Sequence, residues 1–229
     1  MKKIKIFFLL FIFTLTNVFI MNSQNIISEK REVQKFHSIK LSVNGNIIVT
    51  LGKPQEIFIK TDNKVLTNLK IEVNKGELEI SLKALTSVKS LVIEIAMEEL
   101  DNLTINGSGS IEVKDEMNIK NLNFAVNGNG SITTKINSEF FYGKIFGSGK
   151  MNLSGKAIST EMEISGSGNI LATELESETA KIKLNAAGVA KLNASNNITI
   201  DIVGAGEVKY TGTPKIKAKI TGSGTIEAL

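Results

Sequence analysis

The chain is poor in the residues on which many protein sites depend. Among its 229 residues there is no cysteine and no tryptophan, and there is one histidine, His37. The lack of cysteine excludes a disulfide scaffold, a thiolate-bound zinc or iron–sulfur site and a thiol nucleophile. A single histidine likewise excludes a histidine-rich metal site. Arg31 is the only arginine, which argues against enzymes that clamp phosphate or carboxylate groups with arginine forks.

The N-terminus has the layout of an export signal. Three lysines within the first five residues precede an apolar segment of 16 residues, and small polar residues follow at Asn22 and Ser23. This pattern is typical of a secretory signal peptide, and the segment is short for a membrane span, which needs about 20 residues. We expect a signal peptide over 1–23, an N-terminal lead over 24–35 and a single domain over 36–229. An uncleaved N-terminal anchor is the alternative.

Removal of the expected signal changes the charge of the protein. Residues 1–23 carry three lysines and no acid, so the formal net charge falls from +4 to +1. A nucleic-acid partner would need a concentrated basic face, so none is expected.

The C-terminal half contains an internal repeat of about 19 residues. A tripeptide of small residues, most often Gly-Ser-Gly, recurs seven times, and its last glycines are 18 to 21 residues apart. Fixed-period repetition is the signature of solenoid architectures. We expect the repeated glycines to form a structural corner: Gly107, Gly109, Gly128, Gly130, Gly147, Gly149, Gly166, Gly168, Gly188, Gly204, Gly206, Gly222 and Gly224.

Aliphatic and polar residues alternate on both sides of each tripeptide, which predicts strands with one buried face. The flanking aliphatics share the parity of the glycines, so both glycines are expected to point inward, where a Cβ has no room. Columns that repeat in register favour successive turns stacked as parallel strands. The predicted fold is an all-β, parallel β-helix-like solenoid. A set of antiparallel hairpins turning at each Gly-x-Gly is the rival fold.

The first half of the chain is strand-like but less regular. Asn44-Gly45-Asn46 resembles a degenerate copy of the corner, and residues 69–80 are typical of a β-hairpin with a turn at 74–76. We expect this half to cap one end of the stack, because an open rung would template aggregation. At the other end we expect the open C-terminal rung to be covered by a loop or by another subunit.

With these features the sequence resembles the bacterial autotransporter adhesin head domain, also called the head GIN domain, of Bacteroidetes-type bacteria. The matching residues are the Gly-Ser-Gly-x-Ile units between Gly107 and Ile226 and the segment 36–47, which reads FHSIKLSVNGNI. The resemblance covers about 36–228. It implies a right-handed β-helix-like fold, export, and an adhesive or surface role, and it supplies no catalytic residues.

Motifs that carry chemistry are scarce. Gly149-Lys150 lacks the preceding glycine and following hydroxyl residue of a phosphate-binding loop. Acidic residues alternate at Glu161/Glu163 and at Glu174/Glu176/Glu178, and a solvated outer face explains them better than a pair of catalytic carboxylates. His37 is expected to be a surface strand residue without a serine or aspartate partner.

Two features bear on ligand binding. Tyr142 and Tyr210 fall on separate predicted turns, so these two residues do not form an aromatic platform for a sugar. The middle residues of the tripeptides form an outward ladder of Ser, Asn and Ala. This ladder fits a sugar-binding or partner-binding surface and fits tight packing at a corner equally well.

The sequence as a whole predicts an exported, non-enzymatic β-solenoid that serves as an adhesin, binding module or structural module of the cell envelope. Its expected location is the periplasm, the cell surface or the extracellular space. No catalytic residue, cofactor or metal is expected. The expected partners are a glycan or an envelope protein, or a second copy bound through the open C-terminal rung. A polysaccharide-active enzyme of the β-helix type is the alternative function.

Overall fold

The protein is described by a computed structural model over residues 26–229, and the expected signal peptide over 1–23 lies outside the described residues. Almost the whole described chain is β-structure, with one short helix, so the predicted fold class is confirmed. The N-terminal elements are β1 (Ile26–Arg31), β2 (Ser38–Leu41), β3 (Asn46–Leu51), β4 (Glu56–Asp62), α1 (Asn63–Asn68), β5 (Leu69–Asn74), β6 (Glu77–Leu82) and β7 (Leu91–Met97). The following elements are β8 (Asn102–Gly107), β9 (Ser110–Asn118), β10 (Asn121–Gly128), β11 (Ser131–Gly147), β12 (Lys150–Gly166), β13 (Asn169–Ala186), β14 (Val189–Gly204), β15 (Glu207–Thr211), β16 (Lys215–Gly222) and β17 (Thr225–Ala228).

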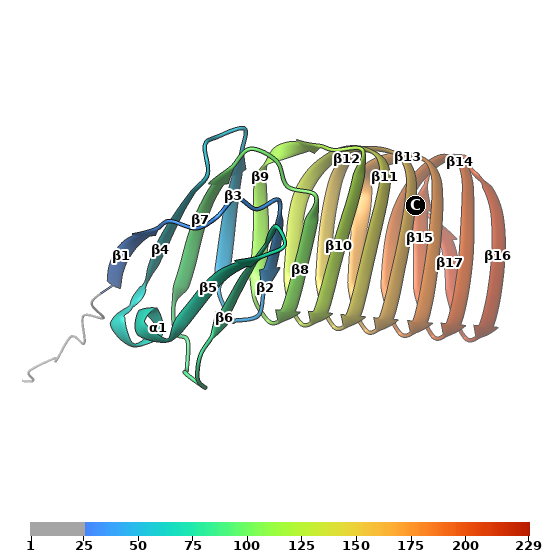
Figure 1. The fold of residues 1–229 in the computed structure, drawn as a ribbon. Coiled ribbons are helices and arrows are strands. Elements are labelled where there is room, and N and C mark those ends of the chain that lie inside the picture. Colours follow the sequence, from blue (N-terminus) through green and yellow to red (C-terminus); the bar gives the residue numbers. More distant parts are fainter. Residues whose placement is uncertain (1–25) are drawn as a thin grey trace, which may run out of the picture.

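The repeated half forms a parallel β-solenoid of about seven turns (Figure 1). The long strands β11 to β14 each make one turn, and each pairs in parallel with the next from one corner to the next corner. Ser131 pairs with Lys150 at the start of β11 and β12, and Gly147 pairs with Gly166 at their end. The antiparallel-hairpin rival is therefore wrong for this region, because every strand pair between β8 and β17 is parallel.

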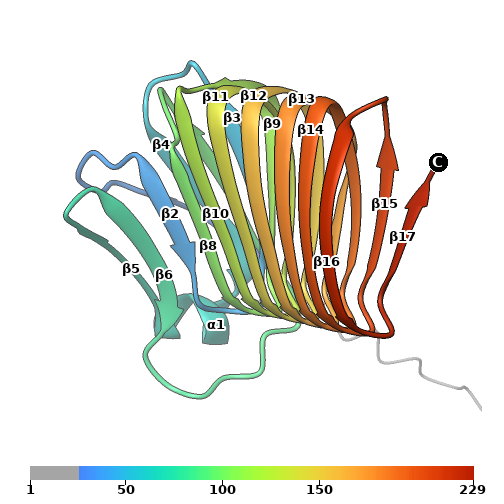
Figure 2. The same cartoon turned by 90° about the vertical axis from the view of Figure 1, so that its right-hand side faces the viewer.

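Each long strand bends midway and so contributes to two walls. The first half of β11 pairs with β9 and its second half pairs with β10. Figure 2 shows the strands of successive rungs curving over together at one edge and turning sharply at the opposite edge, where the glycines lie. The space between the walls holds the core, because the inward positions of both walls are apolar and buried.

Inward side chains stack in columns that run along the solenoid. The residues two positions before the corner are fully buried from Ile105 to Ile202, among them Val126, Ile145 and Ile164. The one glycine in the neighbouring aliphatic column, Gly143, leaves room for the ring of Phe141, because a Cβ on Gly143 would lie 2.9 Å from that ring. The Phe141 ring also meets Phe124 edge-on at 5.2 Å between centroids. The interior is thus filled even where the repeat is broken.

The irregular half covers the first rung of the stack. Strands β2 and β3 form that rung: β2 pairs with β8 and with β6, and β3 pairs with β9 and with β7. Antiparallel pairs then extend both walls outward, β6 with β5 and β7 with β4. This region, residues 26–101, is called the cap below. It occupies the strand edges that the first rung would otherwise expose.

Two details of the cap bear on the sequence predictions. The β5–β6 hairpin is confirmed, and its turn residues Lys75 and Gly76 have φ values of 51° and 80°, as a two-residue hairpin turn with positive φ requires. The expected lead over 24–35 contains β1, which pairs antiparallel with β4. Part of that segment therefore belongs to the sheet.

The far end of the stack is less covered. β16 pairs with β14 and β17 pairs with β15, and no strand within residues 26–229 pairs along their outer edges. The inward residues Ile216 and Ile220 are 42% and 43% exposed, whereas their neighbours one rung earlier, Ile198 and Ile202, are buried. The described residues place no loop over this rung, and coverage by another subunit stays a prediction. No helix in the described part of the chain has the length and apolarity to cross a membrane.

Candidate functional site: the glycine corner and the outer faces

The second glycine of each tripeptide faces the interior of the stack. A Cβ added to Gly168 would lie 2.5 Å from Ile145 Cγ2 and 3.0 Å from the carbonyl oxygen of Gly149, one rung earlier. Seven positions share this surrounding of an aliphatic side chain and a glycine carbonyl from the rung before: Gly109, Gly130, Gly149, Gly168, Gly188, Gly206 and Gly224. Glycine is needed in this column because atoms of the preceding rung already occupy the space that a Cβ at this position would take.

The first glycine of each tripeptide has a different role. In Gly107, Gly128, Gly147, Gly166, Gly204 and Gly222 the φ angle lies between +116° and +131°. A Cβ on Gly128 would also approach the carbonyl oxygen of Gly107 to 2.6 Å. We expected both glycines to point inward; the structure limits the second glycine by inward packing and the first by its backbone conformation. Ala186 occupies the first-glycine column with φ of 99°, a region that L-residues rarely adopt.

The predicted degenerate corner at 44–46 is confirmed. The amide of Ser110 donates to the carbonyl of Gly45 (2.9 Å), just as the amide of Ser131 donates to the carbonyl of Gly109 one rung later (3.0 Å). Gly45 therefore begins the second-glycine column beneath Gly109. The corner runs through the cap as well as through the repeats.

A second bend lies at the opposite edge of the solenoid and was missed by the sequence analysis. Gly155 and Gly212 there have φ values of +100° and +94°, and an added Cβ would collide with the carbonyl of Ile136 or Ala194 in the rung before. Each follows a first-column glycine, Gly147 or Gly204, by eight residues. That equal offset was the available signal.

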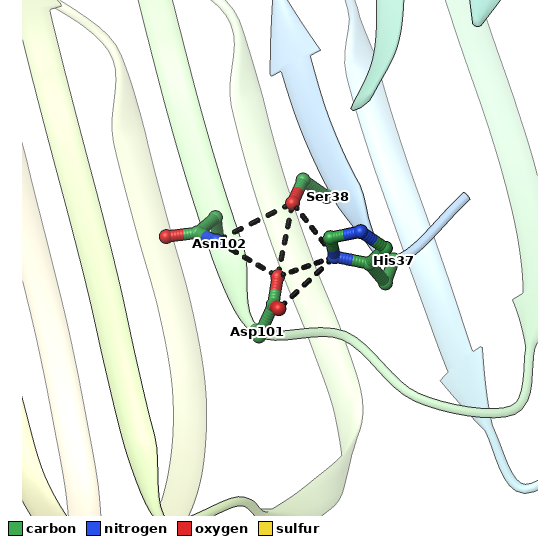
Figure 3. A network of polar contacts seen from close by, with 4 residues as sticks. All are labelled: His37, Ser38, Asp101 and Asn102. Carbon is green, nitrogen blue, oxygen red and sulfur yellow. Dashed lines mark hydrogen bonds and ion pairs between the residues drawn. The ribbon is translucent and has the colours of Figure 1, made fainter. Parts of the chain in front are cut away.

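His37 contradicts the expectation that it has no serine or aspartate partner. Its Nδ1 lies 3.0 Å from Asp101 Oδ2, and Ser38 Oγ donates to Asp101 Oδ1 at 2.9 Å (Figure 3). Asn102 Nδ2 donates to the same carboxylate oxygen at 2.8 Å. The sequence could not show this because 64 residues separate His37 from Asp101, and only the pairing of β2 with β8 brings them together.

The His37 cluster does not have the geometry of a nucleophilic triad. A triad needs the serine at Nε2 of the imidazole and the carboxylate at Nδ1. Here Ser38 and Asp101 both lie beside Nδ1, and Nε2 faces Gly76 in the β5–β6 turn. The amides of His37 and Ser38 also donate to the carbonyl of Gly76. The cluster links the hairpin, the first rung and the second rung by hydrogen bonds, so its role is structural. It is called the brace below.

Of the five carboxylates expected on a solvated outer face, Glu161, Glu163 and Glu176 are paired with lysines of adjacent rungs, and Glu174 and Glu178 are exposed. Glu161 lies 2.8 Å from Lys181, and this hydrogen bond holds the pKa of Glu161 below its usual value, with burial opposing the shift. Glu163 lies 3.5 Å from Lys144. Among residues 26–229 no group of three or more His, Cys, Asp or Glu side chains gathers as metal ligands.

Two open grooves run beside the second bend. One, of about 430 Å³, is lined in part by Thr133, Asn152 and Glu174. The other, of about 560 Å³, includes Glu176 and Glu178. Both linings combine hydroxyl, amide and charged side chains with aliphatic ones, such as Leu171 in the first groove and Ile158 in the second.

The comparisons with known proteins agree with this architecture. Residues 35–214 match the family described as "Putative auto-transporter adhesin, head GIN domain". The chain belongs to this family. The head GIN match covers the corner at 44–46, most of the cap and most of the repeats. A search among curated proteins finds no significant match.

Solved structures of low sequence identity share the fold. A "putative adhesin" from Bacteroides fragilis NCTC 9343 has a TM-score of 0.84 and 24% identity, over 90% of this chain and 98% of that chain. A "Putative lipid binding protein" from Parabacteroides distasonis ATCC 8503 has a TM-score of 0.76 and 20% identity, over 90% and 98% of the two chains. A "putative adhesin" from Parabacteroides merdae ATCC 43184 has a TM-score of 0.70 and 19% identity, over 91% and 97%. These likenesses concern the fold.

Proposed function

We propose that the protein is an exported, non-enzymatic solenoid that serves as a binding or structural module of the cell envelope or the cell surface. Membership of the head GIN family supports an adhesive role. Two of the structural neighbours are named as adhesins. The signal-like residues 1–23 support export.

The arrangement of charge on the outer faces carries the non-enzymatic part of the proposal. In a catalytic pair of carboxyl groups the two pKa values differ, because the general acid has a raised pKa and the other group stays ionised. Glu161 has a lowered pKa because Lys181 donates to it, and Glu163 and Glu176 are also paired with lysines. This arrangement suits a solvated face that presents paired charges to a partner.

The interior gives no support to lipid binding, which the printed name of one neighbour mentions. Ile145, Ile164 and Leu184 lie between the walls with no exposed surface. Aliphatic side chains from successive rungs thus fill the space that an acyl chain would need. Any ligand would meet the outer faces.

The enzymatic alternative is tested by assaying the chain from residue 24 against a panel of polysaccharides for release of reducing ends. We expect no release, and we expect retention of the labelled protein on envelope preparations. Release that disappears in Glu161→Gln or Glu176→Gln would establish the enzyme and overturn the proposal. A module should instead lose retention only when several side chains of one face are changed.

Export is tested separately. Residues 1–23 fused to alkaline phosphatase, which is active only after export, should give active enzyme in a bacterial host. A fusion that begins at residue 24 is the control. An inactive 1–23 fusion would contradict export by this segment.

A further inference from the structure

The outer face of β11 carries three aromatic side chains in a row. Phe140, Tyr142 and Phe146 alternate with the inward residues of the same strand and point away from the core. Phe140 is 37% exposed, Phe146 is 62% exposed, and Tyr142 is half-buried. These three residues are called the aromatic row below.

The repeat does not require aromatic residues at these positions. In the rung before, the row's partners are Asn121, Asn123 and Asn127, and in the rung after they are Ser159, Glu161 and Ser165. The same columns continue with Thr179, Lys181 and Asn185. Solvent-facing aromatic residues contribute little to the core, so their presence in one rung calls for another explanation.

The row has a definite size and shape. At about 3.3 Å per residue, Phe140 and Tyr142 are spaced by roughly 7 Å, and the row extends over about 20 Å along the strand. It is one strand wide, because the polar rungs on either side are only about 4.8 Å away. The row is therefore a narrow apolar strip with amide, hydroxyl and carboxylate groups along both margins.

We propose that the aromatic row is a binding site for a glycan chain lying along β11. This proposal rests on the proposed function and names the ligand class for it. A sugar ring has an apolar C–H face and a rim of hydroxyl groups. Its face would stack on the aromatic rings, while its hydroxyls would bond to the side chains of Asn123, Asn127 and Ser165, which supply donors and acceptors. Lys144, within the row, is engaged by Glu163 at 3.5 Å, so the strip has no free positive charge of its own.

Two other classes of occupant fit less well. A stable protein interface buries about 800 Å² on each partner around an apolar centre, and a strip one strand wide offers no such centre. An anionic membrane surface needs a cluster of free positive charges, and the lysines beside the row, Lys144 and Lys181, are paired with Glu163 and Glu161. The observations therefore favour a slender, neutral, hydroxyl-rich ligand.

The test uses variants that copy the residues of neighbouring rungs, which keeps the fold. Phe140→Ser takes the residue of Ser159, and Phe146→Asn takes that of Asn127. The matched control is Val203→Asn, because Val203 is 48% exposed in the column of Phe146, three rungs away. Binding is measured by affinity electrophoresis on β-glucan, xylan, mannan and pectin, and by sedimentation with cellulose, chitin and peptidoglycan.

We expect the parent chain to bind at least one of these glycans and the Phe140→Ser/Phe146→Asn double variant to bind it about tenfold or more weakly. Val203→Asn should bind like the parent. Equal binding by the double variant would overturn the site while leaving the proposed function intact. Binding to phosphatidylcholine vesicles alone, or to none of the glycans, would overturn the ligand class. Release of reducing ends would instead contradict the proposed function.

A spectroscopic measurement locates the ligand directly. The chain has no tryptophan and two tyrosines, Tyr142 and Tyr210, so a Tyr210→Phe variant leaves Tyr142 as the only tyrosine and the source of the fluorescence excited beyond the absorption of phenylalanine. A bound glycan should change this emission at saturating concentration. No change during binding that affinity electrophoresis detects would place the ligand elsewhere and overturn the proposal.

Discussion

The cap and the repeated rungs solve the same problem in different ways. Both must pair the backbone N–H and C=O groups at strand edges and bury aliphatic side chains. The rungs do so by repeating one local arrangement, parallel and in register, from β8 to β17. The cap uses antiparallel pairs, a hairpin and the short helix α1, and its β1–β4 and β4–β7 pairs join segments farther apart in the sequence than neighbouring rungs are. The cap thus covers one end of the repeats with strand pairs that do not themselves repeat.

The two regions meet at the first rung, and the glycine columns reveal the boundary. A Cβ on Gly128 would collide with the rung before, whereas a Cβ on Gly107 would meet nothing within 4 Å. Gly107 is thus restricted by its φ angle alone. Substitutions on either side of this boundary can separate packing from backbone conformation.

The largest effect is expected from Gly168→Val in the middle of the rungs. The branched side chain would enter the space held by Ile145 Cγ2 and the carbonyl of Gly149, which we expect to destabilise the protein by about 4 kcal/mol. Urea unfolding followed by circular dichroism measures the change. An unfolding midpoint equal to that of the parent would refute the inward position of this glycine.

The next effect compares the same substitution on the two sides of the boundary. Gly128→Ala should cost about 3 kcal/mol, because it combines an unfavourable φ with a collision, and Gly107→Ala should cost about 1–2 kcal/mol from φ alone. Both variants are unfolded in urea under the same conditions. Equal losses would mean that stacking against the previous carbonyl contributes nothing.

A change at the junction tests the brace. Asp101→Ala removes the acceptor for Ser38 and Asn102 and the partner of His37, and a loss of about 1–2 kcal/mol is expected. Hydrogen exchange should show the β5–β6 hairpin losing protection while the rungs from β12 to β14 keep theirs. Uniform loss over the whole chain would show that cap and rungs unfold as one unit.

We expect a gain in stability from a substitution at Ala186, the one non-glycine residue among the seven first positions of the tripeptides. Ala186→Gly relieves a φ of 99°, and after the entropy that glycine adds to the unfolded chain the net stabilisation should be about 1 kcal/mol. Thermal unfolding of the two proteins gives the comparison. A lower melting temperature for the variant would show that the Ala186 methyl group contributes packing that outweighs its strain.

The smallest effect concerns the outer face and depends on pH. Because Lys181 lowers the pKa of Glu161 below the usual 4.5, the pair stabilises the folded state above that pH and loses its effect as the pH falls through the folded-state pKa. Glu161→Gln should therefore lower the urea midpoint slightly at pH 7 and not at pH 3. High salt should reduce the difference at pH 7, since the pair is exposed. A difference that grows as the pH falls would reverse the assignment.

The predictability of each feature followed the range of the interactions behind it. The corner glycines and the β5–β6 hairpin depend on residues close in sequence, and the sequence pattern predicted both. The His37 cluster was not, since it joins residues 64 positions apart through the pairing of β2 with β8. The aromatic row was not predicted because it stands out only beside the polar residues of the adjacent rungs, and the pairing of β11 with β10 and β12 defines those neighbours.

The sequence by itself determined that the chain is a β-solenoid with small residues at one edge, because alternation and period are local properties that survive repetition. It also determined the family, since the repeated units and the segment 36–47 carry the resemblance. Only the tertiary structure decided that the two glycines of each corner serve different ends, that Asp101 reaches His37, and that three aromatic side chains meet solvent in one row. Those facts depend on which rung lies against which, and stacking is a relation between distant parts of the chain.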